Sequence, residues 1–307
     1  MADFNNFNNG ALCILGCGNL GIAILDGLVN APVEKLNAPP FTRYNACVRS
    51  ESSQKRITTR FAASEANIII YINNNVQAVL AADVIILGPD PTDVESVLQE
   101  PGLLEALSNK LLISIVAGWT RQKLETTLYG SATTARDFWA DRACIVRTLP
   151  NIAAQVSQSL TAIETPEPGF PERYLQITTW IFEQIGKVVH VEPRLMNATT
   201  AVGGSTPAFF AVICDAMIDA AVAVGLPRDL AHAMIFQSMH GTATMLQSGI
   251  HPALLKDQGT SPEGCTIGGL MVMEEGGVRG HIGRALREAV TLARLMETTE
   301  HVNDTRH

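Results

Sequence analysis

The sequence lacks the cysteine patterns that bind zinc or build a disulfide framework. Six cysteines occur among its 307 residues, and none belongs to a CxxC pair. They are Cys13, Cys17, Cys47, Cys144, Cys214 and Cys265. No spacing of His, Cys and Asp fits a set of metal ligands either, so we expect no metal site. Scattered, reduced thiols are typical of the cytoplasm, where we expect this protein to act.

Blocks of lysine and arginine are also missing. The formal net charge is −8, and only 17% of the residues are charged. Such a chain is poorly suited to bind nucleic acid or an anionic membrane. The first ten residues contain no basic segment, so they predict neither a secretory signal nor an Arg-rich transit peptide. The longest apolar run, from Pro207 to Gly225, contains Asp215 and Asp219, and we interpret it as a buried helix rather than a membrane span.

Hydrophobic residues make up 47% of the chain, enough for one large core or two modest ones. From Ala11 to Val191 short β-rich runs alternate with helical periods. The expected strands are Ala11–Leu15, Tyr44–Val48, Ile68–Ile72, Val84–Leu87, Leu111–Ile115, Cys144–Leu149 and Val188–Val191. The helices expected between them include Leu20–Val29, Ser52–Ala63, Arg121–Leu128 and Glu172–Gln184. Such alternation is typical of βαβ units around a mainly parallel sheet.

Beyond Pro193 no stretch predicts a strand. The helical patterns there are Pro207–Val224, Arg228–Ser248, Ile267–Glu275 and His281–Glu297. The first is apolar on most of its faces, which indicates a bundle that a second subunit completes. The predicted fold class is therefore α/β, with a Rossmann-type dinucleotide-binding domain over residues 1–193 and an all-helical dimerisation domain over residues 194–307.

The sequence reads GxGxxG over Gly16–Gly21, directly after the first expected strand and at the start of the first expected helix. In a dinucleotide site Gly16 permits the tight turn, Gly18 lets a pyrophosphate approach the backbone, and Gly21 lets the helix pack closely on the strand. The alternative is a glycine turn with a structural role only.

The end of the second strand indicates which dinucleotide binds. Chains that bind NAD place Asp or Glu there for the ribose hydroxyls, whereas this chain has Arg49 and Ser50. A cation and a hydroxyl suit a 2′-phosphate, so NADPH is the favoured cofactor and NADH a possible one. The alternative is that Arg49 is a solvated loop residue.

A polar loop, Thr260–Thr266, leads into the helical pattern near the C-terminus. The unpaired N–H groups and partial positive charge of a helix start can bind a small anion such as a carboxylate. The alternative interpretation of Thr266 is that it is merely the N-cap of that helix.

Together these motifs resemble the pyrroline-5-carboxylate reductase family over nearly the whole chain. The matching segments are Gly16–Gly21, Leu112–Trp119, Leu149–Asn151, Gly204–Phe209, Gly225–Arg228, His251–Pro252, Leu255–Asp257, Ser261–Thr266 and Met273–Gly277. The resemblance implies NAD(P)H-dependent reduction of a cyclic imine acid, most simply 1-pyrroline-5-carboxylate to L-proline. It also implies homodimers that often assemble into decamers.

The motifs and the resemblance together indicate which residues form the sites. We expect the cofactor to bind at Gly16, Gly18, Asn19, Leu20, Gly21, Arg49, Ser50, Pro89, Ala117, Gly118 and Asn151. We expect the substrate to bind at Ser261, Glu263, Gly264, Cys265 and Thr266. The resemblance implies that Thr266 occupies the family's substrate-contacting threonine position, and it is the expected catalytic residue. Its hydroxyl can hydrogen-bond the ring nitrogen, and no strong general acid is needed because the imine can enter protonated.

Several residues depart from the family pattern. Asp90 stands in place of a lysine, Ile152 in place of a threonine, Thr206 and Glu263 each in place of a glycine, and Gly259 in place of a valine. These departures leave three possibilities open: the proline-forming enzyme, a paralogue that reduces a substituted pyrroline or a six-membered imine acid, and a catalytically inactive dinucleotide-binding protein.

The closest competing enzyme class is the β-hydroxyacid dehydrogenases, which also join a Rossmann domain to a helical one. They need a catalytic lysine near the start of the second domain, where it serves as a general base. After Lys187 this chain has only Lys256, which lies in the wrong place.

Overall fold

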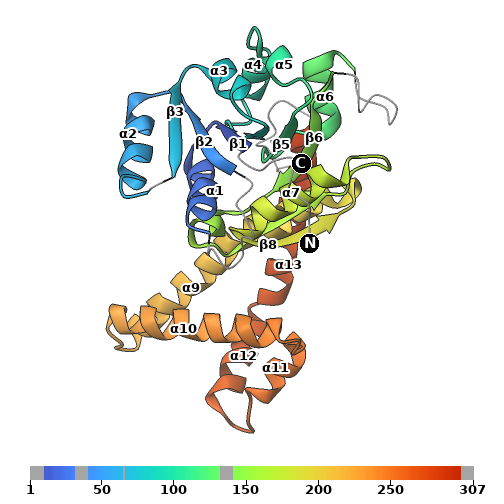
Figure 1. Cartoon of the computed structure of the whole chain (residues 1–307). Helices are drawn as coiled ribbons and strands as arrows, with labels where there is room; N and C mark the ends of the chain where they lie inside the picture. Colours follow the sequence, from blue (N-terminus) through green and yellow to red (C-terminus); the bar gives the residue numbers. More distant parts are fainter. Residues whose placement is uncertain (1–9, 32–40, 65, 132–140, 299–307) are drawn as a thin grey trace. The chain divides into compact units, whose positions relative to one another are not determined.

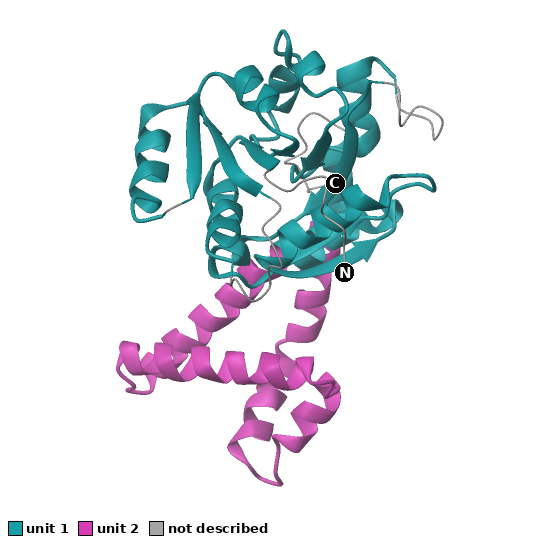
Figure 2. Ribbon diagram, viewed as in Figure 1, with its two compact units in different colours: residues 1–204, 290–307 teal, residues 205–289 magenta. Residues whose placement is uncertain are grey.

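The computed structural model describes residues 10–31, 41–64, 66–131 and 141–298. Contacts group the chain into two compact units (Figure 2). Residues 1–204 and 290–307 form the first unit, and residues 205–289 form the second. The predicted domain boundary between residues 193 and 194 stays a prediction, while the contacts change units eleven residues later, at Gly204.

The first unit is built around an eight-stranded sheet in the order β3-β2-β1-β4-β5-β6-β7-β8 (Figure 1). The strands are β1 Gly10–Leu15, β2 Phe41–Val48, β3 Asn67–Ile72, β4 Val84–Leu87, β5 Leu111–Ser114, β6 Cys144–Leu149, β7 Ser159–Glu164 and β8 Gly186–Val191. Neighbouring strands are parallel except β6 and β7, which are antiparallel. All seven expected strands are present and the mainly parallel sheet is confirmed, whereas β7 was not predicted.

Helices connect these strands. They are α1 Asn19–Val29, α2 Glu51–Arg60, α3 Asn75–Leu80, α4 Val94–Leu98, α5 Leu103–Ala106, α6 Arg121–Tyr129 and α7 Glu172–Glu183. β1 shows why the sheet needs two layers of cover. Leu12 and Ile14 pack in one core cluster with Ile24 of α1, while Cys13 and Leu15 pack in another. Because both faces are buried, the strand is apolar throughout rather than alternating.

A short irregular helical run joins the sheet to the second unit. It consists of a 3-10 turn Pro193–Leu195, α8 Met196–Thr199 and a π-helical turn Thr200–Ser205. The helices that follow are α9 Thr206–Ala223, α10 Arg228–Gln247, α11 Pro252–Gln258, α12 Cys265–Glu275 and α13 Val278–Thr298. No strand occurs among the described residues after Val191, as expected. α11 was not predicted, and α12 begins two residues before its predicted start.

The prediction that the apolar helix is buried is wrong for the single chain. Of the residues of α9, only Cys214 and Ile218 are buried, and Val212 is 70% exposed. By length and composition alone, the helical run Pro193–Ala223 is apolar enough to cross a membrane. Exposed apolar surface of this extent marks a contact with another protein or with a membrane.

Candidate functional site

The turn between β1 and α1 is shaped by contacts that exclude a side chain at Gly16. Its φ is +76°, and a Cβ there would lie 2.6 Å from the backbone nitrogen of Pro89. The turn can therefore approach the end of β4 only with glycine at this position. The first hydrogen bond of α1 follows, in which the N–H of Ile22 donates to the carbonyl of Gly18 at 2.9 Å.

The N-terminus of α1 is open. Its N-cap residue is Gly18, which has no side chain to satisfy the first N–H groups of the helix. A Cβ on Gly18 would meet nothing closer than the carbonyl oxygen of Gly16 at 4.0 Å. At Gly21, in contrast, a Cβ would lie 3.1 Å from Ile14 Cγ2, so helix and strand are in close contact there. Free N–H groups above open space suit an anionic group.

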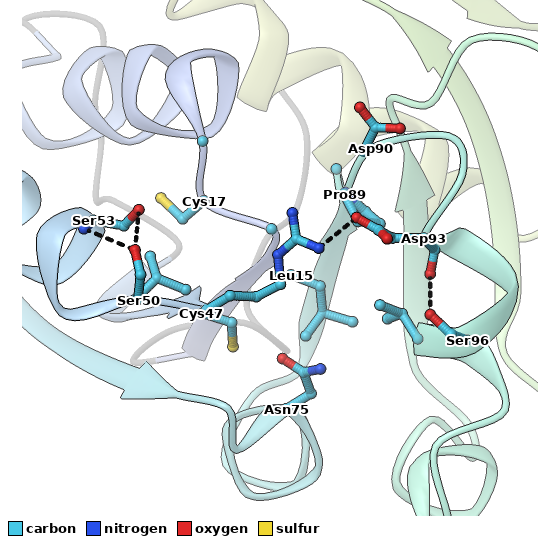
Figure 3. Close-up of a pocket in the computed structure, with 16 residues that line it drawn as sticks. Leu15, Cys17, Cys47, Ser50, Ser53, Asn75, Pro89, Asp90, Asp93 and Ser96 are labelled. Atoms are coloured by element: carbon cyan, nitrogen blue, oxygen red, sulfur yellow. Dashed lines mark hydrogen bonds and ion pairs between the residues drawn. The ribbon is translucent and has the colours of Figure 1, made fainter.

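A cavity of about 450 Å³ lies in front of this turn (Figure 3). Among the residues that line it are Gly16, Gly18, Arg49, Ser50 and Pro89. They follow β1, β2 and β4, which are adjacent in the sheet, and the chain reverses its strand order between β1 and β4. The crevice at the carboxyl ends of strands beside such a switch point is where open α/β sheets bind ligands.

Charged side chains cross the mouth of the cavity. Arg49 Nη1 lies 2.6 Å from Asp93 Oδ2, in an ion pair whose guanidinium side chain is 77% exposed (Figure 3). Asp90 accepts from the hydroxyl of Thr92 at 2.7 Å and from its N–H at 3.0 Å. The hydroxyl bond is the main reason that the pKa of Asp90 lies below its usual value. Ser50 accepts from the N–H of Ser53 at 3.3 Å and so caps α2.

Two thiols, Cys17 and Cys47, also line the cavity. Burial raises the pKa of the Cys17 thiol to about 12. At neutral pH this group is therefore a thiol and not a thiolate nucleophile. The sequence motifs did not single out Cys47, Ser53, Asn75 or Asp93 for this site. Asn75 and Asp93 come from α3 and the residue before α4, and only the strand order brings them to β2.

Six residues predicted to bind the cofactor are not among those that line this cavity: Asn19, Leu20, Gly21, Ala117, Gly118 and Asn151. A Cβ on Gly118, whose φ is +76°, would lie 3.2 Å from Met296 Cβ. The amide of Asn151 donates to the carbonyl of Gly203 at 2.8 Å and accepts from the N–H of Ala153 at 3.1 Å. Gly118 and Asn151 therefore have a role in packing and in local hydrogen bonding. Their part in cofactor binding stays a prediction.

Asn19, Leu20 and Gly21 continue from the turn into the first turn of α1. The side-chain oxygen of Asn19 accepts from Arg56 Nη1 at 2.9 Å, which ties α1 to α2. The role of these three residues toward a cofactor also stays a prediction.

The residues predicted to bind substrate lie in the second unit. They form a turn in which the N–H of Gly264 donates to the carbonyl of Ser261 at 3.0 Å, with Glu263 at a φ of +58°. A Cβ on Gly264 would lie 2.5 Å from Ser261 Oγ. The helix α12 follows at once, with Gly264 as its N-cap and no side-chain cap. The interpretation of Thr266 as the N-cap is therefore wrong, because Thr266 is the second residue of the helix.

This turn has the features of an anion site. Within the single chain Ser261, Glu263, Cys265 and Thr266 are all exposed. The first N–H groups of α12 have no side-chain partner and carry the positive end of the helix dipole. No group of three or more His, Cys, Asp or Glu side chains in the described part of the chain is arranged to hold a metal ion.

Known proteins resemble both parts of the chain. Residues 193–296 match a family model for pyrroline-5-carboxylate reductase dimerisation, and residues 11–118 match one for NADP oxidoreductase, coenzyme F420-dependent. A pyrroline-5-carboxylate reductase from Lophium arboricola is 42% identical over 310 residues, which cover 96% of each chain. One from Neurospora crassa is 38% identical over 322 residues, again 96% of each.

The fold is similar to a solved structure of Plasmodium falciparum pyrroline carboxylate reductase with NADP bound. The TM-score is 0.77 at 24% identity, and the alignment covers 95% of this chain and 99% of the other. This likeness concerns the Rossmann-like sheet and the helical C-terminal region alike.

Proposed function

Because the chain belongs to the pyrroline-5-carboxylate reductase family of oxidoreductases, we propose that it reduces 1-pyrroline-5-carboxylate to L-proline with NADPH. The observation that carries the proposal is the open N-terminus of α1 above Gly18, inside a cavity at the sheet's switch point. The relatives at 42% and 38% identity carry the name of this activity.

The cavity fits a dinucleotide. The N–H groups at the start of α1 suit a pyrophosphate, and the space over Gly18 leaves room for it. At the end of β2, Arg49 with Ser50 and Ser53 offers a cation and two hydroxyls near the expected ribose. A nicotinamide dinucleotide is supported by the family, and NADP is bound in the Plasmodium falciparum structure. NADPH is our choice because β2 ends in a cation and not a carboxylate.

The turn before α12 would hold the substrate. The backbone N–H groups around Cys265 and Thr266 are placed to bind the carboxylate of a cyclic imine acid. Thr266, on the first turn of the helix, would hydrogen-bond the ring nitrogen through its hydroxyl. When bound, the reduced nicotinamide supplies a hydride to the imine carbon. The protein needs no strong general acid, because the imine enters protonated and the nitrogen ends as an amine.

A second candidate substrate is favoured by Glu263. This residue lies in the turn itself with a backbone in the left-handed region, where the family pattern has glycine. A carboxylate beside an anion site disfavours a second carboxylate unless the side chain points to solvent. A substituted pyrroline or a six-membered imine acid that places its own carboxylate differently is therefore the alternative.

Steady-state kinetics with NADPH tests these readings together. We expect kcat/KM for 1-pyrroline-5-carboxylate in the ordinary enzyme range, about 10⁴ to 10⁸ M⁻¹s⁻¹. A value far below that range, with higher values for a methylated pyrroline carboxylate or a six-membered imine acid, would favour the paralogue. Binding of NADPH without turnover of any of these rings would favour an inactive dinucleotide-binding protein.

We also propose that the enzyme acts in the cytoplasm as a homodimer, with a decamer as a further assembly. The scattered thiols support a place in the cytoplasm, and the match to a dimerisation model over residues 193–296 supports the homodimer.

A further inference from the structure

The carboxylate of Asp93 lies beside the residues that follow β2, although β2 itself ends without an acidic residue. The strand ends at Val48 and continues into Arg49 and Ser50. Asp93, the residue before α4, is brought to the same place by the adjacency of β1 and β4, and its Oδ2 lies 2.6 Å from Arg49 Nη1 (Figure 3). The cavity thus presents both the cation that suits a 2′-phosphate and the carboxylate that suits free ribose hydroxyls.

The side chains that line the cavity carry more negative than positive charge. Three charged residues line the cavity in the part of the chain that the structure describes: Arg49, Asp90 and Asp93. Asp90 is held by Thr92, so the near partner of Arg49 is Asp93. A 2′-phosphate that approaches Arg49 must share its guanidinium with Asp93 and is repelled by the same carboxylate. A 2′-hydroxyl meets no such repulsion and can donate to the carboxylate.

We propose that Asp93 is a cofactor-selecting residue. Its carboxylate weakens the preference of the cavity for the 2′-phosphate, so that the protein accepts NADH alongside NADPH. This inference rests on the proposed dinucleotide-dependent function. It assigns the selectivity to a pair, Arg49 with Asp93, rather than to the cation at the end of β2 alone.

A role in folding does not account for Asp93. Its side chain makes no capping hydrogen bond to α4, which is only five residues long. The ion pair is exposed on the Arg49 side, and exposed pairs of this kind contribute little to stability. Replacement of Asp93 by Asn should therefore leave the fold intact, which a thermal melt of the full chain will check.

Direct titration of NADP⁺ and NAD⁺ into the full-length protein by calorimetry tests the proposal without turnover. In Asp93→Asn we expect NADP⁺ to bind about fivefold more tightly, while NAD⁺ binds no more tightly than to the wild type. The matched control is Glu95→Gln, which removes an equal charge from α4 at a residue that does not line the cavity. Its two affinities should stay within about twofold of the wild type, a change small beside that expected for Asp93→Asn.

Two further outcomes sharpen the test. Arg49→Gln should weaken NADP⁺ and spare NAD⁺, and the gain in Asp93→Asn should shrink at high salt because it is electrostatic. An NADP⁺ to NAD⁺ ratio in Asp93→Asn equal to that of Glu95→Gln overturns the proposal. Weaker NADP⁺ binding in Asp93→Asn also overturns it, because Asp93 would then orient Arg49 for the phosphate. A wild type that binds neither nucleotide rejects the proposed function itself, which is a distinguishable failure.

Discussion

At the scale of single residues, the same substitution at two glycines of one turn should have different effects, on stability at Gly16 and on cofactor binding at Gly18. Gly16→Ala places a Cβ 2.6 Å from the backbone of Pro89 at a φ of +76°, so we expect a loss of about 1–3 kcal/mol of stability. Gly18→Ala meets nothing closer than the Gly16 carbonyl oxygen at 4.0 Å and should fold normally. It should nevertheless weaken NADP⁺ binding at least about tenfold, because the methyl group occupies the space of the pyrophosphate. Urea unfolding and calorimetric titration measure the two effects.

The prediction fails if Gly18→Ala unfolds as readily as Gly16→Ala, since close packing would then exclude a side chain at both positions of the turn. Gly21→Ala gives an internal comparison. Its Cβ would lie 3.1 Å from Ile14 Cγ2 and 3.4 Å from both Cys17 Sγ and the Gly16 carbonyl oxygen, so its effect on stability should fall between the other two.

Thr266→Ala should separate chemistry from folding. The N-cap of α12 is Gly264, so removal of the Thr266 hydroxyl breaks no capping bond. We expect kcat to fall about ten- to a hundredfold through loss of one hydrogen bond to the reacting ring. The dissociation constant for NADP⁺ and the melting temperature should be nearly unchanged, and Thr266→Ser should restore most of the activity. An equal loss of cofactor binding would indicate a structural role.

The sequence predicted residue roles well where they depend on local backbone geometry. The close approach at Gly16 and the close packing at Gly21 both follow from a GxGxxG turn between a strand and a helix. Asp93 could not be found in this way. It is 44 residues from Arg49 in the chain. The two meet only because α4 follows β4, which is separated from β2 in the sheet by β1 alone. The sequence shows that a cation follows β2 but not which anion faces it.

At the scale of secondary-structure elements, one buried arginine holds several of them together. Arg147 of β6 is 3% exposed, and its Nη2 donates to Glu297 Oε1 of α13 at 2.8 Å. Its Nη1 lies 3.7 Å from Glu164 Oε2 at the end of β7. Asn197 of α8 donates to the other oxygen of Glu297 at 2.7 Å. The last turns of α13 are thereby fixed to the sheet through charge.

Glu164 gives this cluster a pH dependence with a definite sign. Burial raises the pKa of Glu164 above its usual value, against the lowering effect of Arg147. The folded state therefore binds more protons than the unfolded state just above the ordinary carboxyl pKa of about 4.3. Stability contributed by this group is present below that pH and is lost as the pH rises through the raised pKa. We expect the stability of Glu164→Gln to fall less over this interval than that of the wild type.

Urea midpoints measured from pH 4 to pH 7.5 test this prediction. The control is Glu167→Gln, because Glu167 is 48% exposed and pairs with Arg121 instead of Arg147. Its profile should run parallel to the wild type. A wild-type profile that rises more steeply than that of Glu164→Gln between pH 4.5 and 7 would contradict the assigned sign.

The missed strand shows where periodicity fails at this scale. β7 has two buried hydroxyl residues, Ser159 and Thr161, at positions where an apolar pattern expects large side chains. Ser159 is tolerated because its hydroxyl accepts from the N–H of Asn151 at 3.1 Å. That partner lies in a loop, so the sequence around β7 gives no sign of it. The predicted strands also contain buried polar residues, such as Asn45 of β2 and Arg147 of β6, but their apolar runs were long enough to identify them.

At the scale of the whole molecule, the second unit buries too little of its own surface to stand alone. Ala231 is the only buried residue of α10, and α12 has none, within the described chain. Val212, Phe236 and Val272 are 70%, 54% and 67% exposed. Apolar helices that stay so exposed need cover from elsewhere. The sequence predicted this need from the composition of α9, although not that the helix would be almost bare in a single chain.

We therefore expect the protein to be at least a dimer, with a mass by light scattering of twice 33.0 kDa or more at micromolar concentration. Its unfolding midpoint should rise with protein concentration, because association stabilises only the folded chain. Val212→Asp should break the assembly or cause aggregation, since it places a charge on the apolar face of α9. Leu80→Asp is the matched control, because Leu80 is 54% exposed but lies on α3 of the first unit. A wild-type monomer with normal stability would show that the exposed helices need no partner.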